Sequence, residues 1–131
     1  TRTVELNDGF DARDLKVWIT AYQPANTDVQ VYMKTQNKED ISSFDSDLSW
    51  RLMKQITSTG AATSTSRGDY REIEFTAPGD TLSPGGYSTT IDGNAVTFET
   101  FKNFAVKICM WSNNASVIPR VADLKAIALD V

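Results

Sequence analysis

The sequence contains no histidine and only one cysteine, Cys109, in 131 residues. Histidine is the commonest general base, the usual partner of a nucleophilic serine and the commonest zinc ligand, so its absence removes the most frequent routes to catalysis and zinc binding. A single cysteine excludes an internal disulfide framework and a cysteine-based zinc site. Because Cys109 stands between Ile108 and Met110, we expect it to be a small buried hydrophobic residue.

The sequence also has no concentrated basic charge and no long apolar run. Its 13 Lys and Arg residues are scattered and its net charge is -4, whereas nucleic-acid binding normally uses a basic patch that displaces counterions. No apolar run approaches the roughly 20 residues of a membrane span, and no signal-peptide pattern opens the sequence. We therefore predict neither a nucleic-acid nor a membrane partner. Because the chain begins at Thr1, the sequence leaves two interpretations open, namely a processed protein and a fragment of a longer one.

The strongest pattern that is present is an alternation of apolar and polar residues. It runs through residues 15–22, 29–33 and 103–112, and a period of two predicts half-buried strands. A Pro/Asn-containing turn at residues 23–27 joins the first two runs, which predicts an antiparallel hairpin. The predicted core residues are Leu15, Val17, Ile19, Val29, Val31, Phe104, Val106, Ile108 and Met110.

Weaker strand patterns complete a single all-β domain over residues 1–131. They cover residues 2–6, 49–56, 70–76 and 121–129; the last has helical Ala and Leu content, but the preceding Pro119 favours a strand. Residues 37–47, 58–69 and 77–95 are expected to be irregular. Seven or eight strands predict a two-layer antiparallel β-sandwich closed by its first and last strands.

No candidate catalytic or metal site outweighs its structural interpretation. Asp40, Asp45 and Asp47 lie in an acidic loop of the kind that binds Ca²⁺, but the loop lacks the Gly and closing Glu of an EF-hand, so we predict a solvated loop and no metal or cofactor. Glu72 and Glu74 share one face of a predicted strand. They are interpreted as the wet face of that strand rather than a glycosidase pair, so we predict no enzymatic activity.

Two short motifs are also interpreted without a function. Arg67-Gly68-Asp69 matches the tripeptide by which adhesive proteins engage integrins, and its glycine also suits a turn before the next strand. Asn114-Ala115-Ser116 fits a glycosylation acceptor, which has meaning only in a eukaryotic secretory context.

Strand-borne aromatic residues are the best candidates for binding. Trp18, Tyr22 and Trp111 are predicted to lie off the core face, where aromatic side chains act either as anchors of a protein interface or as a platform on which sugars stack. We favour the protein interface and name these three residues as its candidate anchors.

Three stretches, residues 1–21, 28–53 and 98–129, resemble modules in virion proteins of tailed bacteriophages, particularly marine and cyanobacterial myoviruses related to the T4 group. The most specific stretch has the strand F-A-V-K-I, a Ser/Asn turn and then V-I-P-R-V-A-D-L-K. The resemblance implies a jelly-roll or galactose-binding-like sandwich, located in the virion as a non-enzymatic tail, baseplate or fibre module. Its implied partners are other virion subunits, and the resemblance leaves open whether the chain forms a homo-oligomer. The alternative is a carbohydrate-binding module that recognises host-surface glycans.

Overall fold

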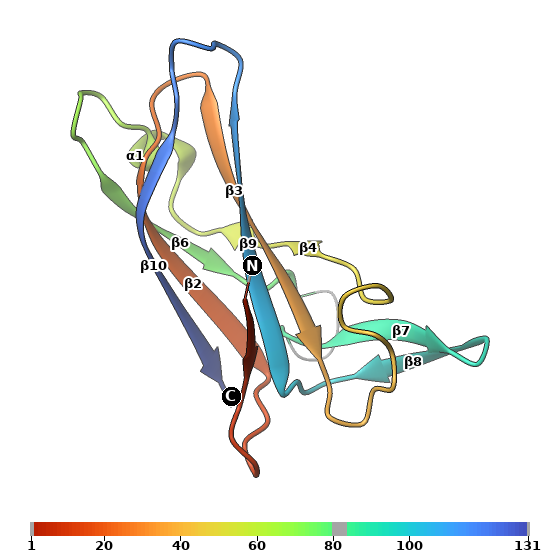
Figure 1. The fold of residues 1–131 in the computed structure, drawn as a ribbon. Coiled ribbons are helices and arrows are strands. Elements are labelled where there is room, and N and C mark those ends of the chain that lie inside the picture. Colours follow the sequence, from red (N-terminus) through yellow and green to blue (C-terminus); the bar gives the residue numbers. More distant parts are fainter. Residues whose placement is uncertain (1, 80–83, 131) are drawn as a thin grey trace.

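A computed structural model describes residues 2–79 and 84–130, which form two antiparallel sheets packed face to face and a separate hairpin (Figure 1). The first sheet has the order β1-β9-β3-β4, with bounds Thr3–Glu5, Asn103–Ser112, Thr27–Gln36 and Arg51–Leu52. The second has the order β10-β2-β6-β5, with bounds Arg120–Leu129, Asp14–Tyr22, Arg71–Thr76 and Lys54–Gln55. The hairpin joins β7 (Tyr87–Ile91) to β8 (Asn94–Phe98). The predicted two-layer antiparallel sandwich is confirmed, with ten strands in the described residues.

Two pairs of long consecutive strands, β2–β3 and β9–β10, form the centre of the sandwich. Each pair crosses from one sheet to the other, so that β2 pairs with β10 in one layer and β3 pairs with β9 in the other. The predicted antiparallel hairpin of residues 15–33 is therefore wrong, because β2 and β3 face each other across the core and belong to different sheets. The β2–β3 turn is closed by the Thr27 hydroxyl, which donates to the Pro24 carbonyl at 2.6 Å, and it places Asn26 at a φ of 65°. Asparagine tolerates this left-handed backbone better than most residues.

The core lies between the sheets and follows the alternation of the sequence. In β2 every odd-numbered residue from Leu15 to Ala21 is buried, and Val29 and Val31 of β3 face them. Ile73 and Phe75 extend this layer from β6. Burying one such side chain stabilises the fold by about 1.5–3 kcal/mol, so these strands supply most of the apolar burial.

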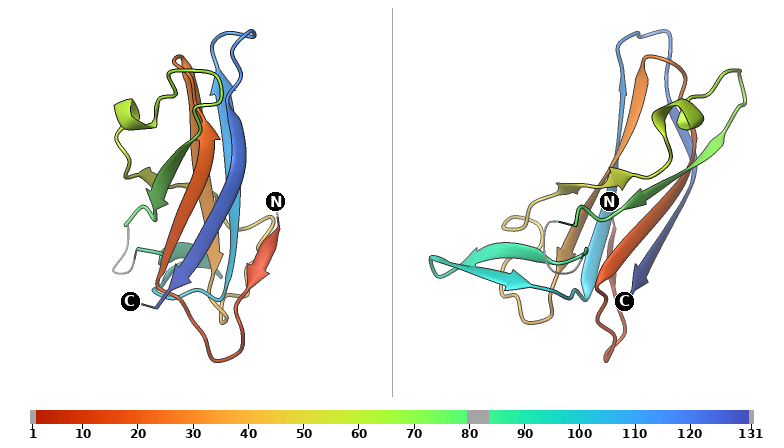
Figure 2. Two further views of the ribbon diagram at one scale, coloured as in Figure 1. Left: turned by 90° about the vertical axis from the view of Figure 1, so that its left-hand side faces the viewer. Right: turned by 180° about the vertical axis from the view of Figure 1, so that it is seen from behind.

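The strand predicted over residues 49–56 is divided by Met53 into two pieces that join different sheets. β4 pairs with β3, and β5 pairs with β6 (Figure 2, right). Met53 lies at the crossing, where its N–H donates to the Val31 carbonyl at 2.9 Å and its side chain is buried. This crossing segment closes one side of the sandwich.

The expectation of irregular structure over residues 77–95 is wrong in its second half. β7 and β8 form a hairpin that projects from the sandwich (Figure 1), joined by Asp92 and Gly93 at φ values of 52° and 80°. Two successive positive φ values define the type I′ turn, which matches the twist of a tight hairpin. In residues 58–69 the structure has one short helix, α1 (Thr59–Ala62). Among the described residues no helix is long and apolar enough to cross a membrane.

Two core predictions for β9 are also wrong. Cys109 is exposed, and Met110, which shares the inward face with buried residues of β3, is 55% exposed. Val106 and Ile108 are only partly buried. The pattern placed Met110 on the correct face, but in the described part of the chain no strand covers that face at the upper end of β9.

Candidate interaction surface and polar cleft

Among residues 2–79 and 84–130, no segment closes the side of the sandwich opposite Met53, so the expected closure by the first and last strands is not found there. In these residues β1 pairs with β9 only at residues 103–105, and β10 pairs only with β2 (Figure 2, left). In the described part of the chain, residues 106–112 of β9 and 120–129 of β10 therefore each present one unpaired strand edge. We call these two segments together the open edge. Natural sheets normally cover or disrupt such edges, because unpaired backbone groups are a template for another strand.

Apolar side chains gather at the open edge and at the turn above it. Met110 and Leu124, both on inward faces, are 55% and 42% exposed. Trp111 and Ile118 flank the β9–β10 turn and are 59% and 63% exposed, and Ile127 of β10 is exposed as well. Five of the 11 large exposed hydrophobic residues in the described part of the chain thus lie between residues 110 and 127, with Trp111 and Ile127 on opposite outer faces. Met110 and Leu124 form the apolar part of the open edge itself, and exposed inward-facing apolar residues are typical of a contact surface.

The three aromatic residues predicted as anchors do not form one patch. Trp18 and Tyr22 lie on the outer face of the second sheet, since the alternate residues of β2 point inward. Trp111 lies on the outer face of the first sheet, on the other side of the molecule. Tyr22 contacts Tyr70, with ring centroids 5.9 Å apart. None of the three is buried in the core, so each stays a candidate contact, with Trp111 nearest to the open edge.

Trp50 was not among the predicted anchors, and it lies on the outer face of the first sheet between two ammonium groups. Lys34 Nζ is 4.8 Å and Lys107 Nζ is 4.7 Å from its ring centroid. Lys34 Nζ also donates to the Phe44 carbonyl at 2.8 Å. Cation–π contacts of this type fix the loop that follows β3 against the sheet. The sequence signal was weak, because Trp50 and Lys107 lie far apart in the chain.

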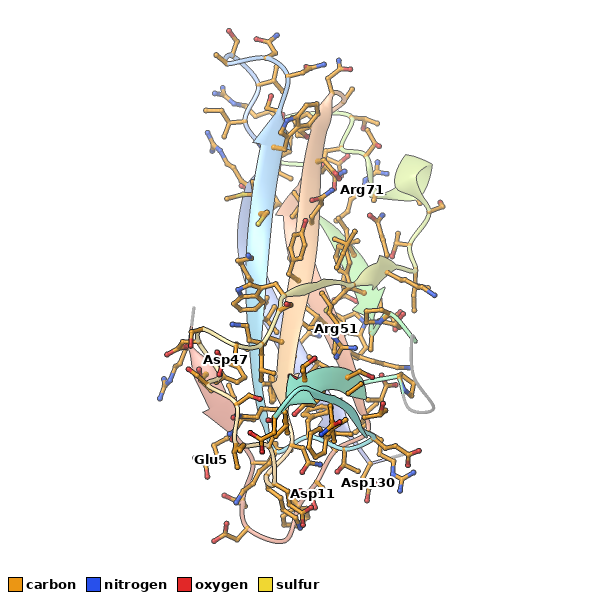
Figure 3. All side chains as sticks on the ribbon, turned by 90° about the vertical axis from the view of Figure 1, so that its right-hand side faces the viewer. Glu5, Asp11, Asp47, Arg51, Arg71 and Asp130 are labelled. Atoms are coloured by element: carbon orange, nitrogen blue, oxygen red, sulfur yellow. The ribbon has the colours of Figure 1, made fainter. Side chains whose placement is uncertain are left out.

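A polar cleft of about 810 Å³ lies between that loop and the β7–β8 hairpin. Arg51 lies beside this hairpin (Figure 3), and its guanidinium donates to the Gly86 carbonyl at 2.6 Å and to the Thr35 hydroxyl at 3.1 Å. Hydroxyl groups dominate the lining of the cleft, which consists of Thr35, Ser46, Asp47, Leu48, Ser49, Arg51, Tyr87, Ser88, Thr89 and Thr90. Such a lining can hydrogen-bond a polar ligand.

The base of the cleft is fixed by the buried pair Tyr87 and Asp40. The Tyr87 hydroxyl donates to Asp40 Oδ2 at 2.6 Å and accepts the Asn37 N–H at 2.8 Å. Burial, together with the Asp40 hydrogen bond, raises the pKa of Tyr87 above its ordinary range. Burial alone would raise the pKa of Asp40, but hydrogen bonds from Tyr87 and Ser42 outweigh it and lower that pKa below its ordinary value. The pair therefore holds the loop after β3 against β7.

Asp40→Asn is expected to lower stability at neutral pH, and the deficit should shrink in acid. A carboxyl with a lowered folded-state pKa stabilises the fold above its unfolded pKa, near 3.8, and loses this contribution as pH falls through the folded value. Urea midpoints of the wild type and the variant at pH 7 and pH 3 measure the difference. Asp45→Asn, in the exposed part of the same loop, is the matched control. A difference that is equal at both pH values would contradict the role of the ionised pair.

The acidic loop does not bring its carboxylates together. Asp40 bonds Tyr87 and the Ser42 N–H, while Asp47 Oδ2 accepts the Ser43 N–H at 2.8 Å and is exposed. Among residues 2–79 and 84–130 no group of three or more carboxylate or thiol side chains is placed to hold a metal ion. These carboxylates therefore act as local turn and loop contacts.

The remaining sequence motifs lie on the outer face of the second sheet and at one end of the sandwich. Glu72 and Glu74 are on the outer face of β6, where Glu72 lies 3.8 Å from Lys125 of β10. Arg67 and Gly68 line a pocket of about 360 Å³ together with Ser116 of the other loop motif. Asp69 of the same tripeptide accepts the Thr65 N–H and pairs with Arg71 at 3.0 Å, so its carboxylate stabilises the local turn.

Comparison with known proteins gives no family for this chain. No family model matches the sequence, and neither the curated proteins nor the solved structures give a significant match. The class that the fold defines is therefore an all-β antiparallel sandwich with one closed and one open side.

Proposed function

We propose that this chain is a non-enzymatic structural domain that assembles with other protein subunits through its open edge. The observation that carries the proposal is that two unpaired strand edges coincide with the exposed, inward-facing side chains of Met110 and Leu124. Strand addition to such an edge supplies backbone hydrogen bonds, and burial of Met110 and Leu124 supplies the apolar contribution. The large surface aromatic Trp111 is a typical anchor of such an interface.

The setting of this assembly is proposed from the resemblance of the sequence to virion modules. A tail, baseplate or fibre of a tailed bacteriophage consists of many subunits in fixed register, and a small sandwich with an open edge suits that role. Its partners would be other virion subunits, each burying on the order of 800 Å² per partner, as specific interfaces do.

Trp111→Ser is expected to weaken or abolish a complex between this chain and the proteins encoded beside its gene. The experiment co-expresses the tagged chain with the proteins encoded beside its gene and measures co-elution by size-exclusion chromatography. Ile56→Ser, an exposed apolar residue just after β5 at the closed side, is the matched control and should leave the complex intact. Loss of a large exposed anchor typically costs about 2 kcal/mol or more of binding free energy, which is roughly thirtyfold in affinity.

Two results would contradict the proposal. One is a complex that Trp111→Ser and Ile56→Ser weaken equally, since the contact would then not lie near the upper end of β9. The other is the absence of any complex together with turnover of glycosides or esters by the purified chain.

A second candidate function is carbohydrate binding, and the polar cleft beside β7 is the observation that favours it. Its Ser, Thr and Asp47 side chains can hydrogen-bond sugar hydroxyls, although Trp18, Tyr22 and Trp111 do not line it. A glycan array with the wild type and Asp47→Ala separates the two candidates. Glycan binding that is lost in Asp47→Ala, with no protein complex, would favour the carbohydrate-binding function.

A further inference from the structure

We infer that the open edge receives a second copy of this chain, so that β9 pairs with the partner's β9 and β10 with the partner's β10 about one two-fold axis. The inference rests on the proposed function, because it names one partner of the same surface. It would join the two sheets of each copy into continuous sheets across the dimer. Three features of the open edge support it, namely backbone direction, axis position and charge.

The backbone groups of both strands point out of the open edge at alternate residues. The Leu6 N–H donates to the Lys102 carbonyl, so even-numbered residues of β9 face the β1 side. Because hydrogen-bonding direction alternates along an antiparallel strand, Val106, Ile108 and Met110 face the same side beyond the end of β1. On β10, the Leu124 N–H donates to the Asp123 carboxylate at 2.9 Å instead of to a β2 carbonyl. Leu124 therefore also faces outward, and both edges offer groups for pairing.

A single axis can serve both strands, because their central residues lie at the same level of the sandwich. Cys109 pairs with Gln30 in the first sheet, and Leu124 pairs with Ile19 in the second. Gln30 and Ile19 are equally far along the chain from the middle of the turn at residues 23–26. Cys109 of one layer and Leu124 of the other thus lie above one another. A two-fold axis through these two points gives an isologous interface in both layers.

The charges of β10 are self-complementary in this register. With Leu124 on the axis, Asp123 lies opposite the partner's Lys125, and Lys125 lies opposite the partner's Asp123. Both side chains are exposed on the outer face, and directly opposed unlike charges stabilise antiparallel pairs. The Leu124 N–H would exchange its bond to the Asp123 carboxylate for a bond to the partner's Leu124 carbonyl. The Asp123 carboxylate is then released to pair with the partner's Lys125. The two reciprocal charge pairs favour a second copy over an unrelated strand, because an unrelated strand need not place a lysine opposite Asp123 and an aspartate opposite Lys125.

The first test uses Cys109 as a reporter of the axis. At a non-hydrogen-bonded antiparallel pair the Cα atoms are about 4.5 Å apart, within the range that a disulfide spans. Diamide oxidises two thiols to one disulfide and takes up the two electrons and two protons. At low micromolar protein the wild type should give mainly a covalent dimer within minutes. The control is the double variant Cys109→Ser/Lys54→Cys, whose only thiol lies on β5 at the closed side. Its disulfide forms by random collision and should appear at least tenfold more slowly than that of the wild type. Equal rates would overturn the inference.

The second test measures the non-covalent dimer in Cys109→Ser by sedimentation equilibrium. Adding Asp123→Lys creates two like-charged pairs and should raise the dimer Kd about tenfold or more. Adding Lys125→Asp as well restores opposite charges and should recover most of the affinity, with circular dichroism checking the fold. A charge swap that fails to restore the dimer would overturn this register.

A chain that is monomeric throughout, yet forms the complex with co-expressed neighbours, would overturn the second copy and leave the proposed function intact. A dimer that forms no such complex would support the second copy and overturn the neighbouring subunits as partners of the open edge.

Discussion

Val17→Asp should leave the domain unfolded or close to unfolding at 25 °C. Val17 has no exposed surface and lies in β2, which pairs with β10 on one side and β6 on the other. An aspartate there would be an unpaired charge in the apolar core, which costs about 4 kcal/mol or more. A domain of this size has a total stability of about 5–15 kcal/mol. Far-ultraviolet circular dichroism with urea titration measures the loss.

Lys16→Asp is the matched control for this substitution. Lys16 is the neighbouring residue on the outer face of the same strand and is partly exposed. The new carboxylate stays in contact with water, so the change should stay within about 1 kcal/mol. Similar losses at positions 16 and 17 would contradict the assignment of the two faces of β2.

Phe101→Ala should cost about 3–5 kcal/mol of unfolding free energy. Phe101 has no exposed surface and contacts Phe104 edge-on, with ring centroids 6.1 Å apart. Its backbone bonds Ala12 in both directions at 2.9 Å, so the ring fills the lower end of the core between the two layers. Phe10→Ala, at a residue 67% exposed, removes the same atoms from the surface and should change the stability by less than about 1 kcal/mol.

Gly85 gives a second measure of the same packing. A Cβ at this position would lie 2.6 Å from Phe101 Cε1 and 2.9 Å from the Arg13 carbonyl oxygen. Gly85→Ala should therefore destabilise the wild type by about 1–3 kcal/mol, and by less in the Phe101→Ala background, because the ring contact is gone. Strictly additive losses in this double-mutant cycle would contradict the close approach of glycine and ring.

The two-layer sandwich could be predicted from sequence because its central strands are buried on one face. The alternation at residues 15–22 and 29–33 matches the buried and outer faces of β2 and β3. The β7–β8 hairpin was missed although its Asp92-Gly93 turn was a local signal. Its strand residues are mostly Ser, Thr and other exposed residues, so no apolar alternation marked it within a glycine- and proline-rich stretch.

The open edge could not be predicted, because the pairing of an edge strand depends on distant segments. The pattern placed Met110 on the inward face, and its exposure follows from β1 ending its pairing with β9 at Ala105. The exposure of Cys109 has a different basis, since the alternation that directs Ile108 and Met110 inward places Cys109 on the outer face. The early end of β1 leaves no signal in the local sequence of β9. The separation of Trp18 from Trp111 onto opposite faces likewise depends on which sheet each strand joins.

Hydrogen exchange tests the central claim, assembly through the open edge, most directly. Backbone amides of Val106, Ile108 and Met110 face the unpaired side of β9, so they should exchange rapidly in the dilute chain, in contrast to amides bonded within β2 and β6. In the complex with co-expressed neighbouring subunits, the same amides and those of β10 are predicted to become strongly protected, while β7 and β8 stay unchanged. Protection confined to the β7–β8 hairpin and the loop after β3, with the open edge still exchanging rapidly, would contradict the account.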